Sequence, residues 1–102
     1  MGKNRTRESL IRKIANTVVH EILLKNTNKP ESEHFIGSEI IEYRSKAERT
    51  SEEHNWNSDD KEYVENKALK MIKEKLASKY PDVNYLEKDA IAKLKSLIKE
   101  LM

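Results

Sequence analysis

The sequence predicts an all-α protein, a single-domain four-helix up-and-down bundle. Apolar residues recur at three- and four-residue steps in several stretches, which is the period of an amphipathic helix. Only two glycines and two prolines interrupt the 102 residues, so the elements between them are few and long. A chain of this length forms one domain, and short connections place consecutive helices antiparallel.

The first predicted helix covers residues 7–25. Residues 1–6 precede it as an expected mobile basic tail, so the bundle itself occupies residues 7–102. Thr6 is the expected N-cap residue, and residues 26–30, with two asparagines and a proline, predict a connection. The broad apolar face of this helix consists of Leu10, Ile11, Ile14, Ala15, Val18, Val19, Ile22 and Leu23.

The second predicted helix is the weakest. It begins within residues 31–38 and ends near residue 49, and Gly37 is expected to interrupt it. Phe35 and Ile41 fall off its narrow apolar stripe, which consists of Ile36, Ile40, Tyr43 and Ala47. Because this stripe covers little surface, the second helix is expected either to be displaced or to be completed by a second copy of the chain, giving a homodimer. The partner of the protein is expected to be another protein or this second copy.

The third and fourth predicted helices have clear end signals. The third covers residues 59–80, with Ser58 as N-cap residue and Pro81 as its stop, and we expect it to organise the bundle. The fourth follows a capping box of Asn84 and Glu87. The apolar stripes are Val64, Ala68, Met71, Ile72 and Leu76 in the third helix, and Leu86, Ala90, Ile91, Leu94, Leu97, Ile98 and Leu101 in the fourth.

Charge is unevenly distributed along the chain. The net charge of +2 is the sum of +4 in residues 1–13, +1 in 14–30, −7 in 31–65 and +4 in 66–102. Attraction between neighbouring helices explains this order without an external partner. Cysteine, a signal-peptide core and a membrane-spanning run are all absent from the sequence, which predicts a cytoplasmic protein that does not contact a membrane.

Residues 31–60 contain two of the three histidines and the only tryptophan, so we expect a functional site there. Glu31 and His34 have the spacing of one half of a carboxylate-bridged di-metal site, but the chain lacks the other half, and no metal or other cofactor is expected. Trp56, Phe35 and Tyr43 are candidate partner contacts. A tryptophan in a loop also folds back to cap the end of a bundle.

The segment Arg49-Thr-Ser-Glu-Glu-His54 resembles the Arg-x(4–6)-His motif of the HEPN family, whose small all-α domains often act as metal-independent ribonucleases. The resemblance covers six residues. It implies that Arg49 stabilises phosphate charge and that His54 moves a proton or positions the 2′-hydroxyl. We expect no cleavage, because the carboxylates of Glu52 and Glu53 inside the motif repel a polyanion.

Two further patterns concern phosphate ligands. The pairs Glu39-x-x-Glu42 and Glu62-x-x-Glu65 resemble the magnesium-binding face of all-α nucleotide pyrophosphatases of the MazG type. The bases Arg5, Arg7, Arg12 and Lys13, with Lys88, Lys95 and Lys99, form a candidate patch for nucleic-acid phosphates. The sequence therefore predicts a small non-catalytic interaction or regulatory protein, with non-specific nucleic-acid binding and an HEPN-like ribonuclease as alternatives.

Overall fold

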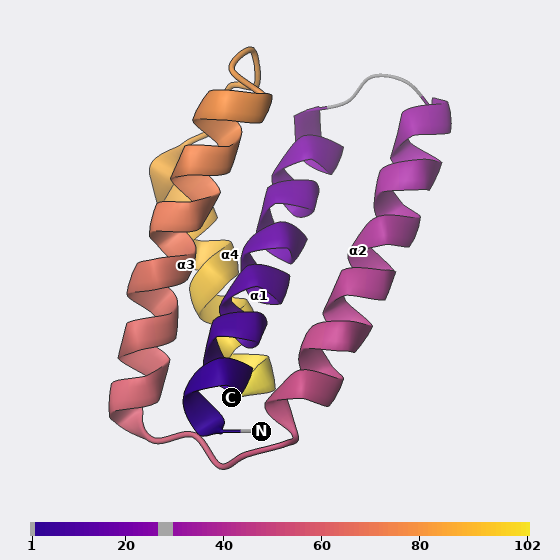
Figure 1. Ribbon diagram of the computed structural model, residues 1–102. Helices are drawn as coiled ribbons and strands as arrows, with labels where there is room; N and C mark the ends of the chain where they lie inside the picture. The colour runs from indigo at the N-terminus through magenta and orange to yellow at the C-terminus, as the bar shows by residue number, and fades with distance from the viewer. Residues whose placement is uncertain (1, 27–29) are drawn as a thin grey trace.

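The computed structural model describes residues 2–26 and 30–102. This part of the chain contains four α-helices and no strand, which confirms the all-α prediction. The helices are α1 (Lys3–Asn26), α2 (Pro30–Ser51), α3 (Ser58–Lys79) and α4 (Glu87–Leu101). Successive helices run in opposite directions (Figure 1) within a body of 40 × 23 × 21 Å. None of the described helices is both long enough and apolar enough to cross a membrane.

The first helix, α1, is the element on which the others pack. It contacts α2, α3 and α4, whereas the described residues of α2 and α3 do not approach each other closely. Adjacent positions such as Leu10 and Ile11, and Ile14 and Ala15, are all buried, so the apolar arc of α1 is wide enough to face three partners. The prediction that the helix over residues 59–80 organises the bundle is therefore wrong.

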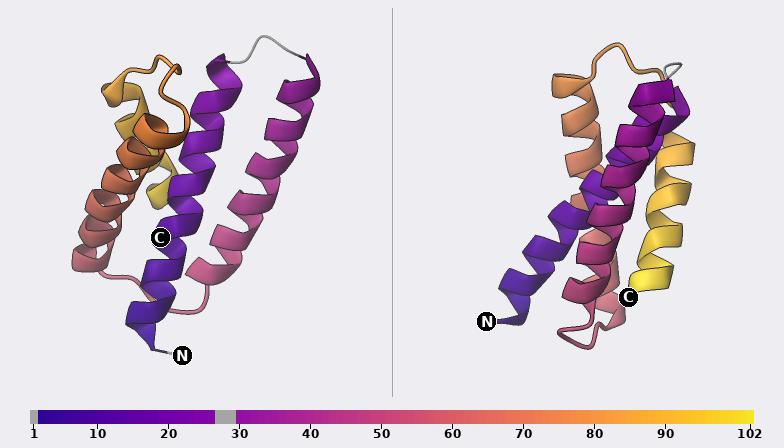
Figure 2. Two further views of the ribbon diagram at one scale, coloured as in Figure 1. Left: turned by 45° about the horizontal axis from the view of Figure 1, so that its top comes forward. Right: turned by 90° about the vertical axis from the view of Figure 1, so that its right-hand side faces the viewer.

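The core is shared unequally among the helices. Of the 16 buried hydrophobic residues in the described part, α1 supplies seven, α3 four, α4 four and α2 only Ala47. The narrow stripe predicted for the second helix thus corresponds to the least buried element. Figure 2 shows that α1 runs obliquely to the other helices, with its N-terminal end projecting on the side away from α4.

The first two helices begin earlier than the sequence predicts. Because α1 starts at Lys3, the end of the expected tail is helical, and Thr6 lies inside the helix and is buried. Helix α2 starts at Pro30 and continues to Ser51 without a break at Gly37, so the predicted interruption is not present. A glycine lowers helix propensity by only about 1 kcal/mol, which neighbouring turns can offset. The predicted connection is helical at both ends, and residues 27–29 lie outside the described residues.

The caps of α3 and α4 also differ from expectation. Asn57, not Ser58, caps α3: its side chain accepts from the Asp60 amide at 2.8 Å, and the Asp60 carboxylate accepts from the Asn57 amide at 3.2 Å. Helix α4 begins after Leu86 with no side-chain cap, so the predicted box at Asn84 is wrong. Glu87 instead forms an ion pair with Lys73 of α3.

Candidate ligand-binding groove

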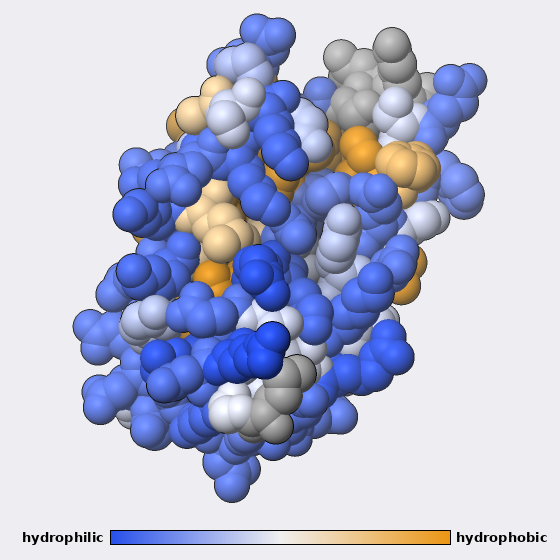
Figure 3. All heavy atoms as spheres, in the orientation of Figure 1, coloured by the Kyte–Doolittle hydropathy of each residue, from blue (hydrophilic) through white to orange (hydrophobic). Residues whose placement is uncertain are grey.

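A polar groove lies where α2 and α3 flank α1 without meeting. Its volume is about 400 Å³, which falls within the range of small-molecule sites. Figures 1 and 3 show the face on which α1 runs between α2 and α3, and hydrophilic residues cover most of it. The lining residues are Asn16, Val19 and His20 of α1, Phe35, Glu39 and Tyr43 of α2, and Lys75, Lys79 and Tyr80 at the end of α3.

His20 forms the fixed polar wall of the groove. Its Nδ1 lies 2.7 Å from the Asn16 carbonyl oxygen, and its Nε2 lies 2.7 Å from a carboxyl oxygen of Glu39. Both ring nitrogens of His20 therefore have a protein partner, which fixes the orientation of the ring. The contact with Glu39 also joins α1 to α2, and the His20 ring lies 5.0 Å from the ring of Tyr43.

Two lysines form the opposite wall. The ammonium group of Lys75 donates a hydrogen bond to the side-chain oxygen of Asn16. Burial lowers the pKa of Lys75, and the like charge of Lys79 lowers it further. Neither lysine forms an ion pair with any described residue. The α3 side of the groove therefore presents two cations without a protein counter-charge.

Aromatic side chains complete the groove. Phe35 is 64% exposed, while Tyr43 and Tyr80 are half-buried. Two of the three partner contacts predicted from the sequence, Phe35 and Tyr43, thus lie in one groove. Exposed Ile41 is six residues from Phe35 and hence about 120° away around α2, so the two do not form one apolar patch.

A second hollow lies on the N-terminal half of α1. Its volume is about 260 Å³, and we call it the basic hollow; it is lined by Arg5, Thr6, Ser9, Arg12, Lys13, Thr50 and Glu53. Lys13 donates to the Thr50 hydroxyl at 2.6 Å, while Arg5 and Arg12 are exposed. Within the described chain none of these three bases forms an ion pair. Three of the four N-terminal bases predicted to bind nucleic acid therefore line this hollow.

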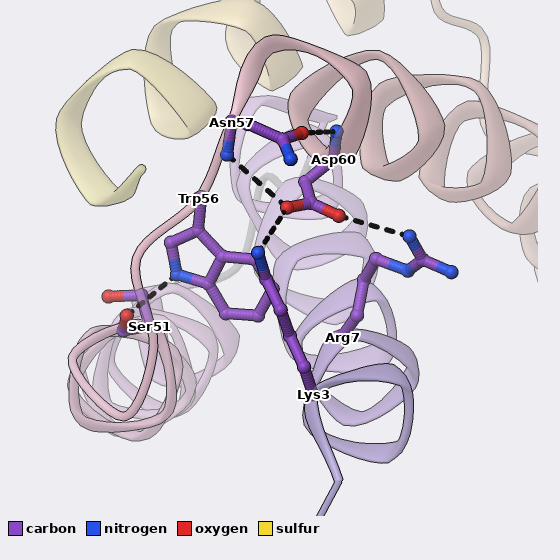
Figure 4. Close-up of polar contacts among 6 residues, drawn as sticks. All are labelled: Lys3, Arg7, Ser51, Trp56, Asn57 and Asp60. Carbon is purple, nitrogen blue, oxygen red and sulfur yellow. Dashed lines mark hydrogen bonds and ion pairs between the residues drawn. The ribbon is translucent and has the colours of Figure 1, made fainter.

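The fourth base, Arg7, belongs to a junction between α1 and α3 (Figure 4). Its guanidinium donates to Asp60 at 3.0 Å, and Lys3 contacts the other carboxyl oxygen at 2.8 Å. The hydrogen bond from Lys3 is the main reason that the pKa of Asp60 lies below its ordinary value. Arg7 also lies over the ring of Tyr63, 3.9 Å from its centroid. It therefore holds the two helices together and is engaged with protein groups.

Trp56 covers the same end of the molecule. Its indole nitrogen donates to the Ser51 carbonyl at 2.7 Å, and the Lys3 ammonium lies 5.5 Å from the ring centroid (Figure 4). The ring is half-buried against the core. This is the placement expected of a tryptophan that caps a bundle end, and its contacts are with protein groups.

Replacing Asp60 by asparagine is expected to lower the melting temperature near neutral pH. The carboxylate has a depressed pKa in the folded state, so its contribution to stability is present above its unfolded pKa of about 4 and is lost as pH falls through the folded value. The difference between wild type and Asp60→Asn should therefore shrink below about pH 4. Thermal unfolding followed by circular dichroism across this range is the measurement.

Asp59→Asn is the matched control, because Asp59 is the exposed neighbour of Asp60 in the same helical turn. Its melting temperature should follow that of the wild type at every pH. An Asp60→Asn variant that lost as much stability at pH 2 as near neutral pH would contradict the role of the charge.

The two residues of the HEPN-like motif have different surroundings. Arg49 is exposed on α2, while the ring of His54 meets the ring of Trp56 edge-on at 5.9 Å. No hydrogen bond or ion pair between Arg49 and His54 is found in the described part of the chain. The two residues of the HEPN-like motif are therefore not held together by a hydrogen bond in this part of the chain.

The acidic pairs are likewise dispersed. Glu31 and His34 are both exposed at the start of α2, and no cluster of three metal-binding side chains occurs among residues 2–26 and 30–102. Glu39 contacts His20 of α1, and Glu42 contacts Lys46 of its own helix at 3.0 Å. Because α2 does not contact α3, these carboxylates do not face the Glu62 and Glu65 pair.

Sequence reasoning missed most of the groove. His20, Lys75 and Lys79 lie outside residues 31–60, where the site was expected. Their spacing could have predicted which side chains lie together. Asn16 and His20 are four residues apart and so share a helical face, and the same holds for Lys75 and Lys79.

Comparison with protein-family models, with curated proteins and with solved structures finds no match to this chain. Function is therefore inferred from the chemistry of the groove and the basic hollow.

Proposed function

We propose that the protein is an up-and-down four-helix bundle that acts by binding, as an interaction or regulatory protein, and that its ligand occupies the groove. The observation that carries this proposal is the presence of two ammonium groups, those of Lys75 and Lys79, in a groove lined by three aromatic rings. Neither group has an ion-pair partner among the described residues. Such a groove fits an aromatic ring that bears a negative charge. The only acid that lines the groove, Glu39, already has a protein partner, because its carboxyl oxygen lies 2.7 Å from Nε2 of His20.

Binding is favoured over catalysis by the hydrogen bonds already made in the groove. Both ring nitrogens of His20 have protein partners, and the Lys75 ammonium is held by Asn16. The groups best suited to moving protons are thus used to position the helices.

The basic hollow supports a second function, the non-specific binding of nucleic-acid phosphates. Arg5, Arg12 and Lys13 line it beside a single acid, Glu53, and phosphate contacts of this kind carry no sequence information. The ribonuclease alternative has less support, because no hydrogen bond joins Arg49 and His54 in the described residues.

Phenyl phosphate tests the groove. In a titration followed by nuclear magnetic resonance, we expect shifts at His20, Tyr43 and Lys75. Tyr43→Ala should weaken binding about 2-fold to 10-fold through the lost ring contact. Lys75→Met, which keeps an apolar stem, should weaken binding of phenyl phosphate more than that of uncharged phenol.

Ile41→Ala is the matched control, because Ile41 is exposed on the opposite flank of α2; it should bind like the wild type. The proposal is wrong if neither compound binds in the groove. It is equally wrong if both shift only residues of another hollow, of about 370 Å³, which is lined by Ile22, Tyr85 and Leu86.

A further inference from the structure

The groove and the basic hollow follow the same face of α1. Arg5, Ser9 and Arg12 line or border the hollow, and Asn16 and His20 line the groove. These five residues are spaced three or four apart, so they form one ridge along the helix. From Arg5 to His20 the ridge is roughly 22 Å long at 1.5 Å per residue.

One flank of α2 runs beside this ridge. Thr50 lines the hollow, Tyr43 and Phe35 line the groove, and the exposed Lys46 lies on the same flank between them. The steps of three, four and eight residues keep these side chains on one side of the helix. The two hollows are therefore parts of one path along the seam between α1 and α2.

Bases outnumber acids in the two hollows of the path. Its two hollows are lined by five bases, Arg5, Arg12, Lys13, Lys75 and Lys79, and by two acids, Glu39 and Glu53. Glu39 is engaged by the Nε2 atom of His20 at 2.7 Å, while the five bases make no ion pairs within the described residues. An extended polyanion can therefore neutralise the bases of both hollows, whereas a single small anion neutralises only the bases of one.

The aromatic rings indicate which kind of polyanion the path binds. Phe35, Tyr43 and Tyr80 cluster at one end of the path and the arginines at the other. Single-stranded nucleic acids combine faces that stack on such rings with phosphates that bind Lys and Arg. In a duplex the bases are paired and stacked on one another, so their faces cannot enter the groove.

We infer that the groove and the basic hollow together form one site for single-stranded nucleic acid. A base stacks among the rings in the groove with its phosphate near Lys75 and Lys79, and the continuing backbone crosses the hollow at Arg12 and Arg5. This assignment rests on the proposed binding role of the groove and extends it to a class of ligand.

Fluorescence anisotropy at low salt tests the inference. The ligands are a labelled single strand of about eight nucleotides, the duplex of the same sequence, and an abasic strand with the same number of phosphates. We expect the single strand to bind more tightly than the other two, by about 5-fold to 100-fold. Phe35→Ala and Tyr43→Ala should each remove part of this preference and leave abasic-strand binding unchanged, whereas Arg12→Ala should weaken both strands.

The controls are Ile41→Ala for the rings and Lys70→Ala for the charges, since both residues are exposed and line neither hollow. Equal binding of all three ligands, unaffected at Phe35 and Tyr43, would overturn the inference in favour of a general polyanion surface. If no oligonucleotide binds while phenyl phosphate still shifts the groove residues, the inference is wrong but the proposed function holds. If neither binds, both are wrong.

Discussion

Replacing Ile72 by alanine is expected to lower the free energy of unfolding by about 2–5 kcal/mol. Ile72 is fully buried in α3 and belongs to the core that α1, α3 and α4 share. Removing its outer carbons leaves a cavity. Because α3 packs against both α1 and α4, it cannot easily move to fill this cavity. Since domains of this size are stable by only about 5–15 kcal/mol, the variant should unfold at a markedly lower urea concentration.

Leu94→Ala in α4 should behave in the same way, because Leu94 is also fully buried. Ile41→Ala is the control: this isoleucine is 69% exposed on α2, and its loss should change the free energy by less than about 0.5 kcal/mol. Urea unfolding followed by circular dichroism measures all three. A change under about 0.5 kcal/mol at both Ile72 and Leu94 would show that the predicted stripes are not buried.

The helices could be predicted because their apolar residues are periodic, and the stripe Val64, Ala68, Ile72 and Leu76 is buried as the period requires. The ends were harder, since several polar residues compete to cap one helix. Ser58 and Asn57 are both good caps, and Asn57 succeeds because Asp60, three residues later, completes the reciprocal pair. That choice in turn places Asp60 beside Lys3 and Arg7, which no local pattern shows.

The groove depends on a property that no single helix has, namely that α2 and α3 both pack on α1 and not on each other. Aromatic composition identified Phe35 and Tyr43, but their neighbours His20 and Lys75 come from helices far away in the sequence. Helix geometry alone could have predicted that the N-terminal arginines do not all lie on one face of α1. Arg5 and Arg12, seven residues apart, share a face, whereas Arg7 is about 200° from Arg5 and faces α3.

Increasing the salt concentration from about 50 to about 200 mM is expected to weaken single-strand binding. The decrease in the logarithm of the affinity is proportional to the number of phosphates that the protein contacts. For single strands the logarithm of the affinity falls with the logarithm of salt at about 0.7 per contact. The three bases of the hollow alone predict a slope near −2 and a loss of about 20-fold. If Lys75 and Lys79 also contact phosphates, the slope approaches about −3.5 and the loss about 100-fold.

The slope thus distinguishes a site confined to the hollow from one that continues into the groove. Arg12→Ala should reduce it by about 0.7, and Lys75→Met should do so only if the strand reaches the groove. Lys70→Ala, which removes an exposed charge outside both hollows, should shift neither slope nor affinity appreciably. Binding that did not respond to salt would contradict phosphate contacts altogether. A slope that fell equally in all three variants would mean that the bases act through net charge and that the positions of Arg12 and Lys75 do not matter.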